Sequence, residues 1–474
     1  MMVFVRLGVV LSMVAGAGFA VAQDTRQVAE PKIPASCVQL SASLRTAGGK
    51  IAEADERRLD TDRIQKALDA CKPGMAVELK PVDGNNAFLT GPLELRSGVT
   101  LLIDEGVTLF ASRDPKLFDA AAKPGVCGTI PAAPVPGGGC RPLLSAVNVT
   151  DAAVMGDGTI DGRGYAKLIG HDYSWWEMAR RAEPKNEKYY SMRLVVANHA
   201  DGLTLYRITL HNSPNFHVSV NGTNGFTAWA VHLLTPVDKG LDARNTDGID
   251  PSGSTNVTVA HSWIDNGDDN IAIKSGTTHM SVLDNHFYTG HGMSIGSETV
   301  GQAYLLVDGL TEDHTSSGIR IKSNVTRGGQ VHDLTYRNIC MRDVANPVAI
   351  SPYYTNQTTE GFVDPHYTGD KIPDYKKIEL DNVISETPGD VLVAGLDEAH
   401  RTEIALHNVV VQGITPQQVH LAYVDIASSG VNFDLSRGTN VKVLDRGKAA
   451  SGPKDAPAGH FGLASCAKVF VPMR

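Results

Sequence analysis

The chain has 474 residues, of which 42% are hydrophobic and 20% are charged, so it has enough apolar sequence for a sizeable core. Its 52 acidic and 43 basic residues give a net charge of −9, and no basic run stands out, which excludes the electrostatic footprint of a nucleic-acid-binding protein. Short Val/Ile/Thr segments recur between Gly, Asn and Asp, so the chain is mostly β-structure.

The first 22 residues have the pattern of an export signal. Arg6 precedes an apolar stretch, and Ala20-Val21-Ala22 is an A-x-A cleavage site. A membrane anchor is the alternative, but the apolar run is short and no second run of transmembrane length follows. We therefore expect a signal peptide at residues 1–22 and a mature chain, residues 23–474, that is secreted or periplasmic and leaves the membrane after cleavage.

Six cysteines follow the cleavage site, and none forms a C-x-x-C pair. An even number of cysteines in an exported chain favours disulfides over a metal site. The pairs that lie near one another in sequence are Cys37 with Cys71 and Cys127 with Cys140, which leaves Cys340 with Cys466. The sequence alone leaves this connectivity open.

Residues 60–71 show the clearest helical period in the chain. Their apolar positions recur at i, i+3, i+4 and i+7, and either Asp60 or Thr61 stands where a side chain can cap the helix. Beyond this helix, we expect a loop closed by its own disulfide at residues 125–140 and an irregular insertion at residues 165–192. The residues from about 445 to 474 are expected to form a loose tail tethered through Cys466.

A repeat of four similar segments determines the fold class. The segments are TDGIDPSG (246–253), DDNIAIKSG (268–276), GHGMSIGS (290–297) and SSGIRIKS (316–323). The steps from Ile249 to Ile271 and from Ile271 to Met293 are 22 residues each, and the step from Met293 to Ile319 is 26. Such a period with short strands and no helix in each repeat predicts a parallel β-helix. We expect a single all-β domain whose open end is capped by the helix at 60–71.

Stacking of these repeats would gather polar side chains on one face. In register, Asp247, Asp269 and His291 form a file whose members are about 4.8 Å apart, and Asp268 lies beside the file. One repeat further, Arg320 and Lys322 stand at i and i+2 of a strand and point the same way. Each residue alone is ordinary in a turn or on a solvated strand, but carboxylates crowded in this way are typical of a functional site.

Paired carboxylates suit the hydrolysis of a glycosidic bond. One carboxylic acid protonates the leaving oxygen, and a carboxylate activates water on the opposite side of the sugar. The stacked pair Asp247 and Asp269 could hold that water, which leaves Asp268 as the acid. The cations Arg320 and Lys322 would bind an anionic substrate, because both match a carboxylate.

A competing motif is Gly292-x-Ser294-x-Gly296, which matches the nucleophile elbow of serine esterases. That motif requires a helix directly after the serine, and the following residues have no helical period. Its glycines also fit the repeat, so we set the esterase interpretation aside.

At the four repeated segments the sequence resembles glycoside hydrolase family 28, the polygalacturonases, and the flanking SPNFHV and SWW resemble the bacterial endo-polygalacturonases. The resemblance covers roughly residues 80–430 and implies a right-handed parallel β-helix. It also implies inverting hydrolysis of α-1,4-linked galacturonic acid, with no metal and no other cofactor.

The resemblance also implies a role for each site residue. Asp268 matches the general acid, Asp247 and Asp269 match the water-activating pair, and His291 matches the essential histidine beside the acid. Arg320 and Lys322 match the cations that grip the galacturonate carboxylate on the leaving-group side. Two further substrate-binding residues are implied less sharply: Asn245, and Tyr354, for which Tyr353 is the alternative.

The sequence thus predicts an endo-polygalacturonase that acts on pectin as a monomer. An exo-acting enzyme of the same family, or one that acts on a modified pectin, is the first alternative. A calcium-dependent pectate lyase and a non-catalytic β-helix binding protein are the others. Retention of Arg320 and Lys322 argues against a rhamnogalacturonan hydrolase, which does not need that grip on a carboxylate.

Overall fold

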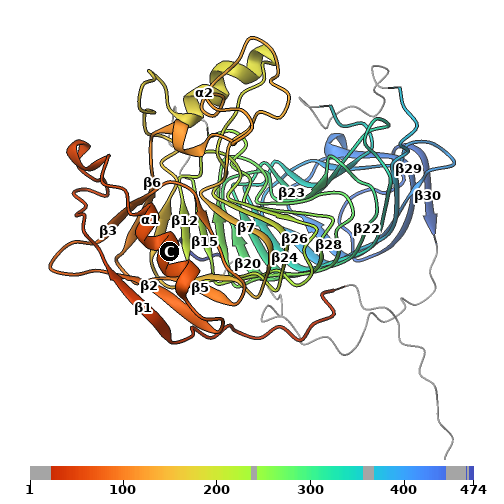
Figure 1. The fold of residues 1–474 in the computed structure, drawn as a ribbon. Helices are drawn as coiled ribbons and strands as arrows, with labels where there is room; N and C mark the ends of the chain where they lie inside the picture. Colours follow the sequence, from red (N-terminus) through yellow and green to blue (C-terminus); the bar gives the residue numbers. More distant parts are fainter. Residues whose placement is uncertain (1–22, 236–242, 356–367, 445–465, 467–468, 474) are drawn as a thin grey trace, which may run out of the picture.

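The computed structural model describes residues 23–235, 243–355, 368–444, 466 and 469–473. Its strands form one continuous parallel arrangement that winds as a solenoid (Figure 1). The parallel β-helix predicted from the repeat is therefore confirmed. The expected signal peptide and most of the expected C-terminal tail lie outside the described residues. Among the described residues, no helix is long and apolar enough to cross a membrane.

Each turn of the solenoid contributes strands to three parallel ladders. The first ladder contains β1 (Ser36–Ser41), β2 (Met75–Lys80), β5 (Val99–Ile103), β8 (Ala153–Met155), β11 (Thr204–Tyr206), β14 (Thr227–Trp229), β17 (Thr255–Ala260), β20 (Thr278–Phe287), β22 (Gln302–Asp313), β24 (Gln330–Arg342), β26 (Asp374–Ser385), β28 (Thr402–Val411), β29 (Val419–Ser429) and β30 (Thr439–Leu444).

The second ladder is shorter and merges into β20. It contains β3 (Ala87–Thr90), β6 (Thr108–Ala111), β9 (Thr159–Asp161), β12 (Thr209–His211), β15 (His232–Leu234) and β18 (Trp263–Asp265). The third ladder contains β4 (Leu93–Glu94), β7 (Leu144–Thr150), β10 (Val195–Asp201), β13 (Val218–Asn221), β16 (Ile249–Ser252), β19 (Ile271–Ile273), β21 (Met293–Gly296), β23 (Ser317–Lys322), β25 (Asn346–Ser351) and β27 (Val391–Ala394), and it also ends on β29.

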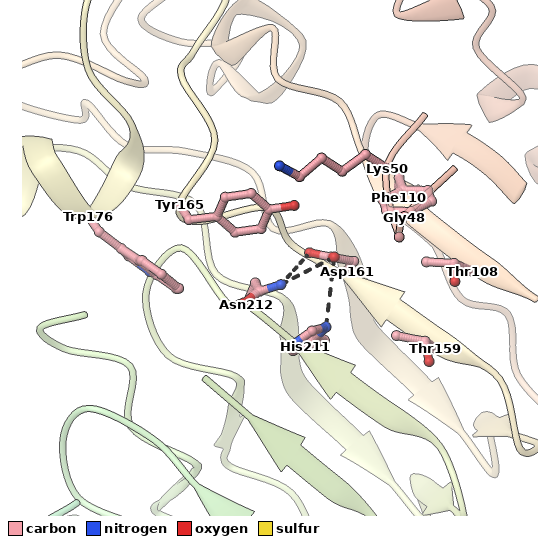
Figure 2. A pocket seen from close by; sticks show the side chains of 11 residues that line it. Gly48, Lys50, Thr108, Phe110, Thr159, Asp161, Tyr165, Trp176, His211 and Asn212 are labelled. Carbon is pink, nitrogen blue, oxygen red and sulfur yellow. Dashed lines mark hydrogen bonds and ion pairs between the residues drawn. The ribbon is translucent and has the colours of Figure 1, made fainter. Parts of the chain in front are cut away.

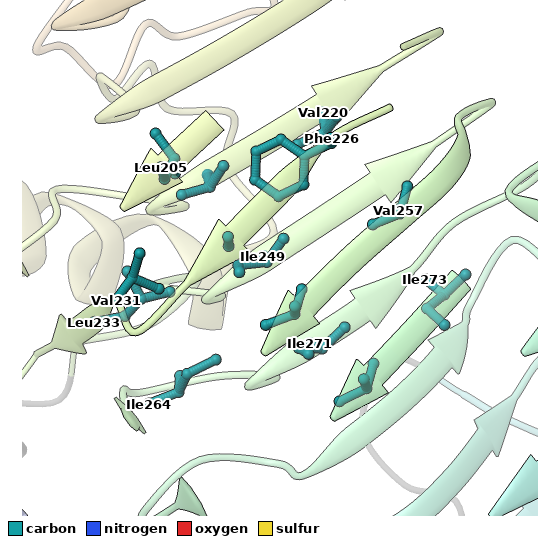
Figure 3. Close-up of a cluster of buried hydrophobic side chains, with 14 of the residues drawn as sticks. Leu205, Val220, Phe226, Val231, Leu233, Ile249, Val257, Ile264, Ile271 and Ile273 are labelled. Carbon is teal, nitrogen blue, oxygen red and sulfur yellow. The ribbon is translucent and has the colours of Figure 1, made fainter. Parts of the chain in front are cut away.

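The register of the third ladder follows the predicted period. Ile249 pairs with Ile271, Ile271 with Met293, and Met293 with Ile319, so the coils of 22, 22 and 26 residues are in phase. These side chains point inward and are fully buried. Figure 3 shows Ile249 and Ile271 stacked above one another with residues of the other ladders. Each such side chain contributes about 1.5–3 kcal/mol through burial, which locks the register of the polar residues beside it.

Helix α1 (Thr61–Ala70) packs its apolar face, Ile64 and Leu68, against the first coils and covers one end of the solenoid (Figure 1). The predicted helix is confirmed, and Asp60 occupies its N-cap position, but the expected side-chain cap is absent. Asp60 makes no capping hydrogen bond; its Oδ2 instead accepts from Leu89 N at 2.9 Å, and so it ties the helix to strand β3.

The long connection between β9 and β10 is more ordered than expected. It contains helix α2 (Trp175–Ala182) and the 3₁₀ turn η3 (Glu183–Lys185), whereas the sequence predicted an irregular insertion. A capping box starts α2, because Ser174 Oγ accepts from Glu177 N at 3.2 Å and Glu177 Oε2 accepts from Ser174 N at 2.7 Å. Three other short 3₁₀ turns are η1 (Glu53–Asp55), η2 (Pro115–Phe118) and η4 (Pro416–Gln418).

Three disulfides join the pairs that the sequence favours. They are Cys37–Cys71, Cys127–Cys140 and Cys340–Cys466, so the expected connectivity is confirmed. The last of them holds the C-terminal Cys466 against strand β24. Disulfides of this kind persist in oxidising compartments, which agrees with the expected export.

Candidate active site

The predicted file of polar residues lies just before the strands of the third ladder begin. Gly248 N donates to Asp269 O at 2.9 Å, and His291 N donates to Asp268 O at the same distance. Together with the paired isoleucines that follow, these bonds place Asp247, Asp269 and His291 in successive coils. The stacking of the three residues inferred from the period is therefore present in the structure.

Asp269 is the most tightly held carboxylate in this cluster. Its Oδ1 accepts from Arg320 Nη1 at 3.0 Å and from Ser294 Oγ at 2.8 Å, and its Oδ2 accepts from Lys322 Nζ at 2.7 Å. Burial opposes ionisation of this group, but the charges of Lys322 and Arg320 outweigh burial and hold the pKa of Asp269 far below its usual range. Asp269 is thus a permanent carboxylate.

Asp268 lies beside the file and is partly open, with 21% of its side chain exposed. Its Oδ1 is 3.2 Å from His291 Nδ1, and its Oδ2 accepts weakly from Asn245 N at 3.3 Å. Burial raises the pKa of Asp268, but the hydrogen bond and charge of His291 outweigh burial and lower it. In the free protein, therefore, Asp268 is an ionised group next to a histidine.

Asp247 has the opposite character. It is 4% exposed, and its Oδ1 has no hydrogen-bond partner among the described residues. Burial, with the nearby carboxylates of Asp250 and Asp268, raises the pKa of Asp247 well above its usual range. Burial also raises the pKa of Asp250 to about 7, although Lys274 Nζ lies 3.8 Å away and opposes the shift. Asp247 and Asp250 are thus more basic carboxylates than Asp269.

The two remaining predicted residues, Tyr354 and Asn245, border the cluster. The Tyr354 ring lies 5.8 Å from the Arg320 guanidinium and 5.4 Å from Lys322 Nζ, so it shares a wall with both cations. Tyr353 instead turns away and bonds Leu396 O through its hydroxyl. The geometry therefore separates the two tyrosines that the sequence left as alternatives.

Asn245 joins the cluster to the β9–β10 connection. Its Oδ1 accepts from Tyr189 Oη at 2.5 Å, and the same hydroxyl lies 3.3 Å from Glu183 Oε1. Glu183 in turn pairs with Arg244 Nη1 at 3.1 Å. Tyr189 and Glu183, which follow helix α2, thus lie beside Asn245, whose backbone N–H contacts Asp268.

Three residues of the cluster were not singled out in the sequence, namely Tyr189, Asp250 and Lys274, and Ser294 was considered only as part of the esterase motif. Lys274 and Ser294 stand at outward positions of repeated segments, so the alternation that marked Arg320 also pointed to them. The signal for Asp250 was its position directly after the buried Ile249. Tyr189 had no periodic signal, because it belongs to a connection outside the coils.

The same cluster offers atoms that could hold a metal ion. Asp268, Asp269 and His291 each place one ligand atom within 4.8 Å of the others. However, Asp269 is already neutralised by Arg320 and Lys322, and Ca²⁺ requires six to eight oxygen ligands. The donor set of the triad therefore fits calcium poorly.

A separate polar cavity of about 430 Å³ lies on the second ladder (Figure 2). Asp161 and His211 face each other there at 3.8 Å, and Asn212 Nδ2 donates to both oxygens of Asp161 at 3.2 Å. Trp176 of helix α2 and Tyr165 form one side of it. It contains none of the residues predicted from the repeat, so the carboxylate cluster on the third ladder is the candidate active site.

A solenoid of parallel coils that presents several carboxylates, a histidine and two cations on one face is typical of enzymes that cleave carbohydrates by acid–base chemistry. Comparison with known proteins identifies the family within this class. Residues 126–430 match the family model for glycosyl hydrolases family 28. The chain belongs to glycosyl hydrolases family 28 and is a glycoside hydrolase.

Individual relatives agree with this assignment. The chain is 42% identical over 395 residues to an endo-polygalacturonase of Pectobacterium carotovorum subsp. carotovorum, which covers 82% of this chain and 90% of that protein. It is 35% identical over 505 residues to a polygalacturonase of Ralstonia solanacearum, with 96% and 94% covered. The solved polygalacturonase from Erwinia carotovora ssp. carotovora superposes with a TM-score of 0.70 at 37% identity, covering 89% of this chain and 100% of that one.

Proposed function

We propose that this protein is an exported endo-polygalacturonase that hydrolyses α-1,4-galacturonosidic bonds of polygalacturonate with inversion. The observation that carries the proposal is the buried contact of Asp269 with Arg320 and Lys322, directly beside the partly open Asp268. It combines the carboxylates that hydrolysis needs with cations that suit a uronate substrate. The endo mode is supported by the name of the Pectobacterium relative.

In the proposed reaction, Asp268 donates a proton to the glycosidic oxygen as the bond to the anomeric carbon breaks. Water attacks that carbon from the opposite side and loses a proton to Asp247, which shares the water with Asp269. Asp247 suits this role because a carboxylate with a raised pKa is the stronger base, and its Oδ1 has no other partner among the described residues.

The acid role of Asp268 requires a proton that the free protein does not favour. Bound substrate is proposed to raise the pKa of Asp268, because a polyanionic sugar that covers Asp268 removes water from it and adds negative charge nearby. Both changes raise a carboxyl pKa. His291, at 3.2 Å, is proposed to adjust and orient Asp268.

Digestion of polygalacturonate with sizing of the products tests this function. We expect mixed oligomers and new reducing ends from the wild type and none from Asp268→Asn, while Asp201→Asn, a change at the exposed end of β10, should retain activity. Monomer or dimer alone would show an exo enzyme. Binding without new reducing ends would leave only a binding protein.

A calcium-dependent lyase is the alternative that the Asp268, Asp269 and His291 triad raises. A lyase would give unsaturated products with ultraviolet absorbance, and a chelator would abolish their formation. We expect no such absorbance and unchanged release of reducing ends in the presence of chelator.

We also propose that the enzyme acts outside the cytoplasm as a monomer. The three disulfides support export, and a solenoid whose end is covered by α1 needs no partner there. Fractionation of the producing cells and gel filtration at several protein concentrations check these two expectations.

A further inference from the structure

Arg193 lies two residues before strand β10 of the third ladder, in the position that corresponds to Asp247 before β16. Leu194 N donates to Phe216 O and His217 N donates to Asp247 O, so Arg193, Phe216 and Asp247 occupy equivalent positions in three successive coils. Neighbouring strands are about 4.8 Å apart, which places the backbone of Arg193 about 10 Å from that of Asp247. No role in the reaction proposed above uses this residue.

The guanidinium of Arg193 reaches the outward side of the third ladder. Its Nη1 lies 3.5 Å from Ser219 Oγ, and Ser219 pairs in register with Asp250. The same outward row continues through Ser294 to Arg320. Arg193 therefore belongs to the surface that carries the carboxylate cluster, but it lies on the side away from Arg320 and Lys322.

The Arg193 side chain is held by weak contacts and forms no ion pair with a described carboxylate, although its charge partly offsets the rise that burial causes in the pKa of the nearby Asp250. Its guanidinium lies over the Phe216 ring, with 4.4 Å from the guanidinium carbon to the ring centroid, and its Nε is 3.4 Å from Asn215 Oδ1. These polar contacts are at the long limit for hydrogen bonds, and a guanidinium has five N–H donors. Within residues 23–235, 243–355 and 368–444, no carboxylate forms an ion pair with Arg193, and its side chain is exposed.

An unpaired, oriented cation on this surface is suited to a carboxylate that comes from outside the protein. A guanidinium binds carboxylates in a planar two-bond geometry, and a polygalacturonate chain presents one carboxylate on every sugar. A chain long enough to lie along the row from Arg320 past the carboxylate cluster would bring a further carboxylate to Arg193.

We propose that Arg193, supported by Phe216, binds the carboxylate of a galacturonate unit on the opposite side of the scissile bond from Arg320 and Lys322. This inference rests on the proposed function. It makes Arg193 a determinant of how strongly long substrates bind and of where they are cut, and it assigns no part of the chemical step to this residue.

The test compares wild type, Arg193→Gln and Arg193→Lys on unesterified oligogalacturonates of increasing length. Loss of a charged hydrogen bond should raise KM roughly tenfold on long oligomers with kcat almost unchanged. An oligomer too short to reach from Arg320 to Arg193 should show no change in KM. End-labelled long oligomers should also be cut at shifted positions, and Arg193→Lys should recover part of the lost affinity.

The matched control is Arg57→Gln, which removes an exposed arginine located before α1. It should behave as wild type on every oligomer. A KM ratio between Arg193→Gln and wild type that does not grow with substrate length, or unshifted cleavage positions, would overturn the inference. If wild type itself fails to cleave polygalacturonate, the proposed function fails and the inference falls with it, so the two failures are distinguishable.

Discussion

At the scale of single residues, Asp268 and Asp269 are neighbours in sequence with different environments. Asp269 is enclosed by two cations and a hydroxyl, whereas Asp268 is partly open and depends on His291. The turn before β19 produces this difference, because it directs one side chain along the ladder and the other toward the β9–β10 connection. Adjacent carboxylates are tolerated here because Asp269 is held mainly by Arg320 and Lys322, whereas Asp268 is held by His291.

Substitution of Asp269 should therefore affect stability as well as activity. Asp269→Asn leaves Arg320 and Lys322 buried without their counter-charge, so we expect the free energy of unfolding to fall by about 3–5 kcal/mol. Asp268→Asn should abolish turnover but lower the free energy of unfolding much less than Asp269→Asn does. Urea unfolding of both variants checks this prediction, and equal losses for the two would contradict it.

Glu312 is a buried acid directly beneath the cluster. Its Oε1 accepts from Met293 N at 3.3 Å, and Oε2 has no hydrogen-bond partner within the described part of the chain. Burial raises the pKa of Glu312 to about 8. Between the unfolded pKa, about 4.3, and this value, the folded state binds the extra proton, so stability falls as pH rises.

Glu312→Gln keeps an oxygen for Met293 N and cannot ionise. We expect the wild type to lose stability between about pH 4 and pH 8 relative to this variant, which should show a flatter dependence. Denaturant unfolding at several pH values measures the difference. Parallel curves for the two proteins would show that Glu312 does not titrate in this range.

At the scale of elements, the coils and the connections differ in how well the sequence predicts them. The 22-residue steps predict that Ile249, Ile271 and Met293 are in register, because buried inward positions are apolar and recur at a regular spacing in the sequence. The β9–β10 connection has no such period, so α2 was missed, although Ser174 and Glu177 have the spacing of a capping box.

The site was predictable to the same extent. Residues within the repeated segments, such as Asp247 and Arg320, could be found from their spacing, and the structure brings them together. Tyr189 could not be found, because its approach to Asn245 depends on the path of a connection. The ion pairing of Arg320 and Lys322 with Asp269 was also not foreseen, since the sequence showed their common direction but not their distance.

The β9–β10 connection should influence catalysis through one hydroxyl. Tyr189→Phe leaves Asn245 Oδ1 without the hydroxyl that now donates to it, so we expect a loss of about 1–3 kcal/mol in stability together with a lower kcat. Tyr190→Phe is the control, because that hydroxyl bonds Val135, away from the cluster. It should cost stability and leave kcat unchanged; similar kcat values for the two variants would exclude this influence.

At the scale of the whole molecule, the three disulfides constrain segments of very different length. Cys340–Cys466 spans 126 residues and Cys127–Cys140 spans 13. Because a longer closed loop removes more entropy from the unfolded chain, replacing both cysteines of the long bridge by alanine should cost about 4–5 kcal/mol, and the short bridge about 3 kcal/mol. Guanidinium unfolding tests this order, and a larger loss for the short bridge would refute it.

The stacking of the cluster across coils also bears on the order in which the chain is made. Residues up to β21 include Asp247, Asp268 and Asp269, whereas Arg320 and Lys322 arrive only with β23. A partly synthesised solenoid therefore carries crowded acids whose main counter-charges are still missing. Addition of the β23 coil relieves that repulsion, so this coil stabilises those before it. The attraction between Asp269 and the two cations therefore favours the docking of the β23 coil on the coils already formed.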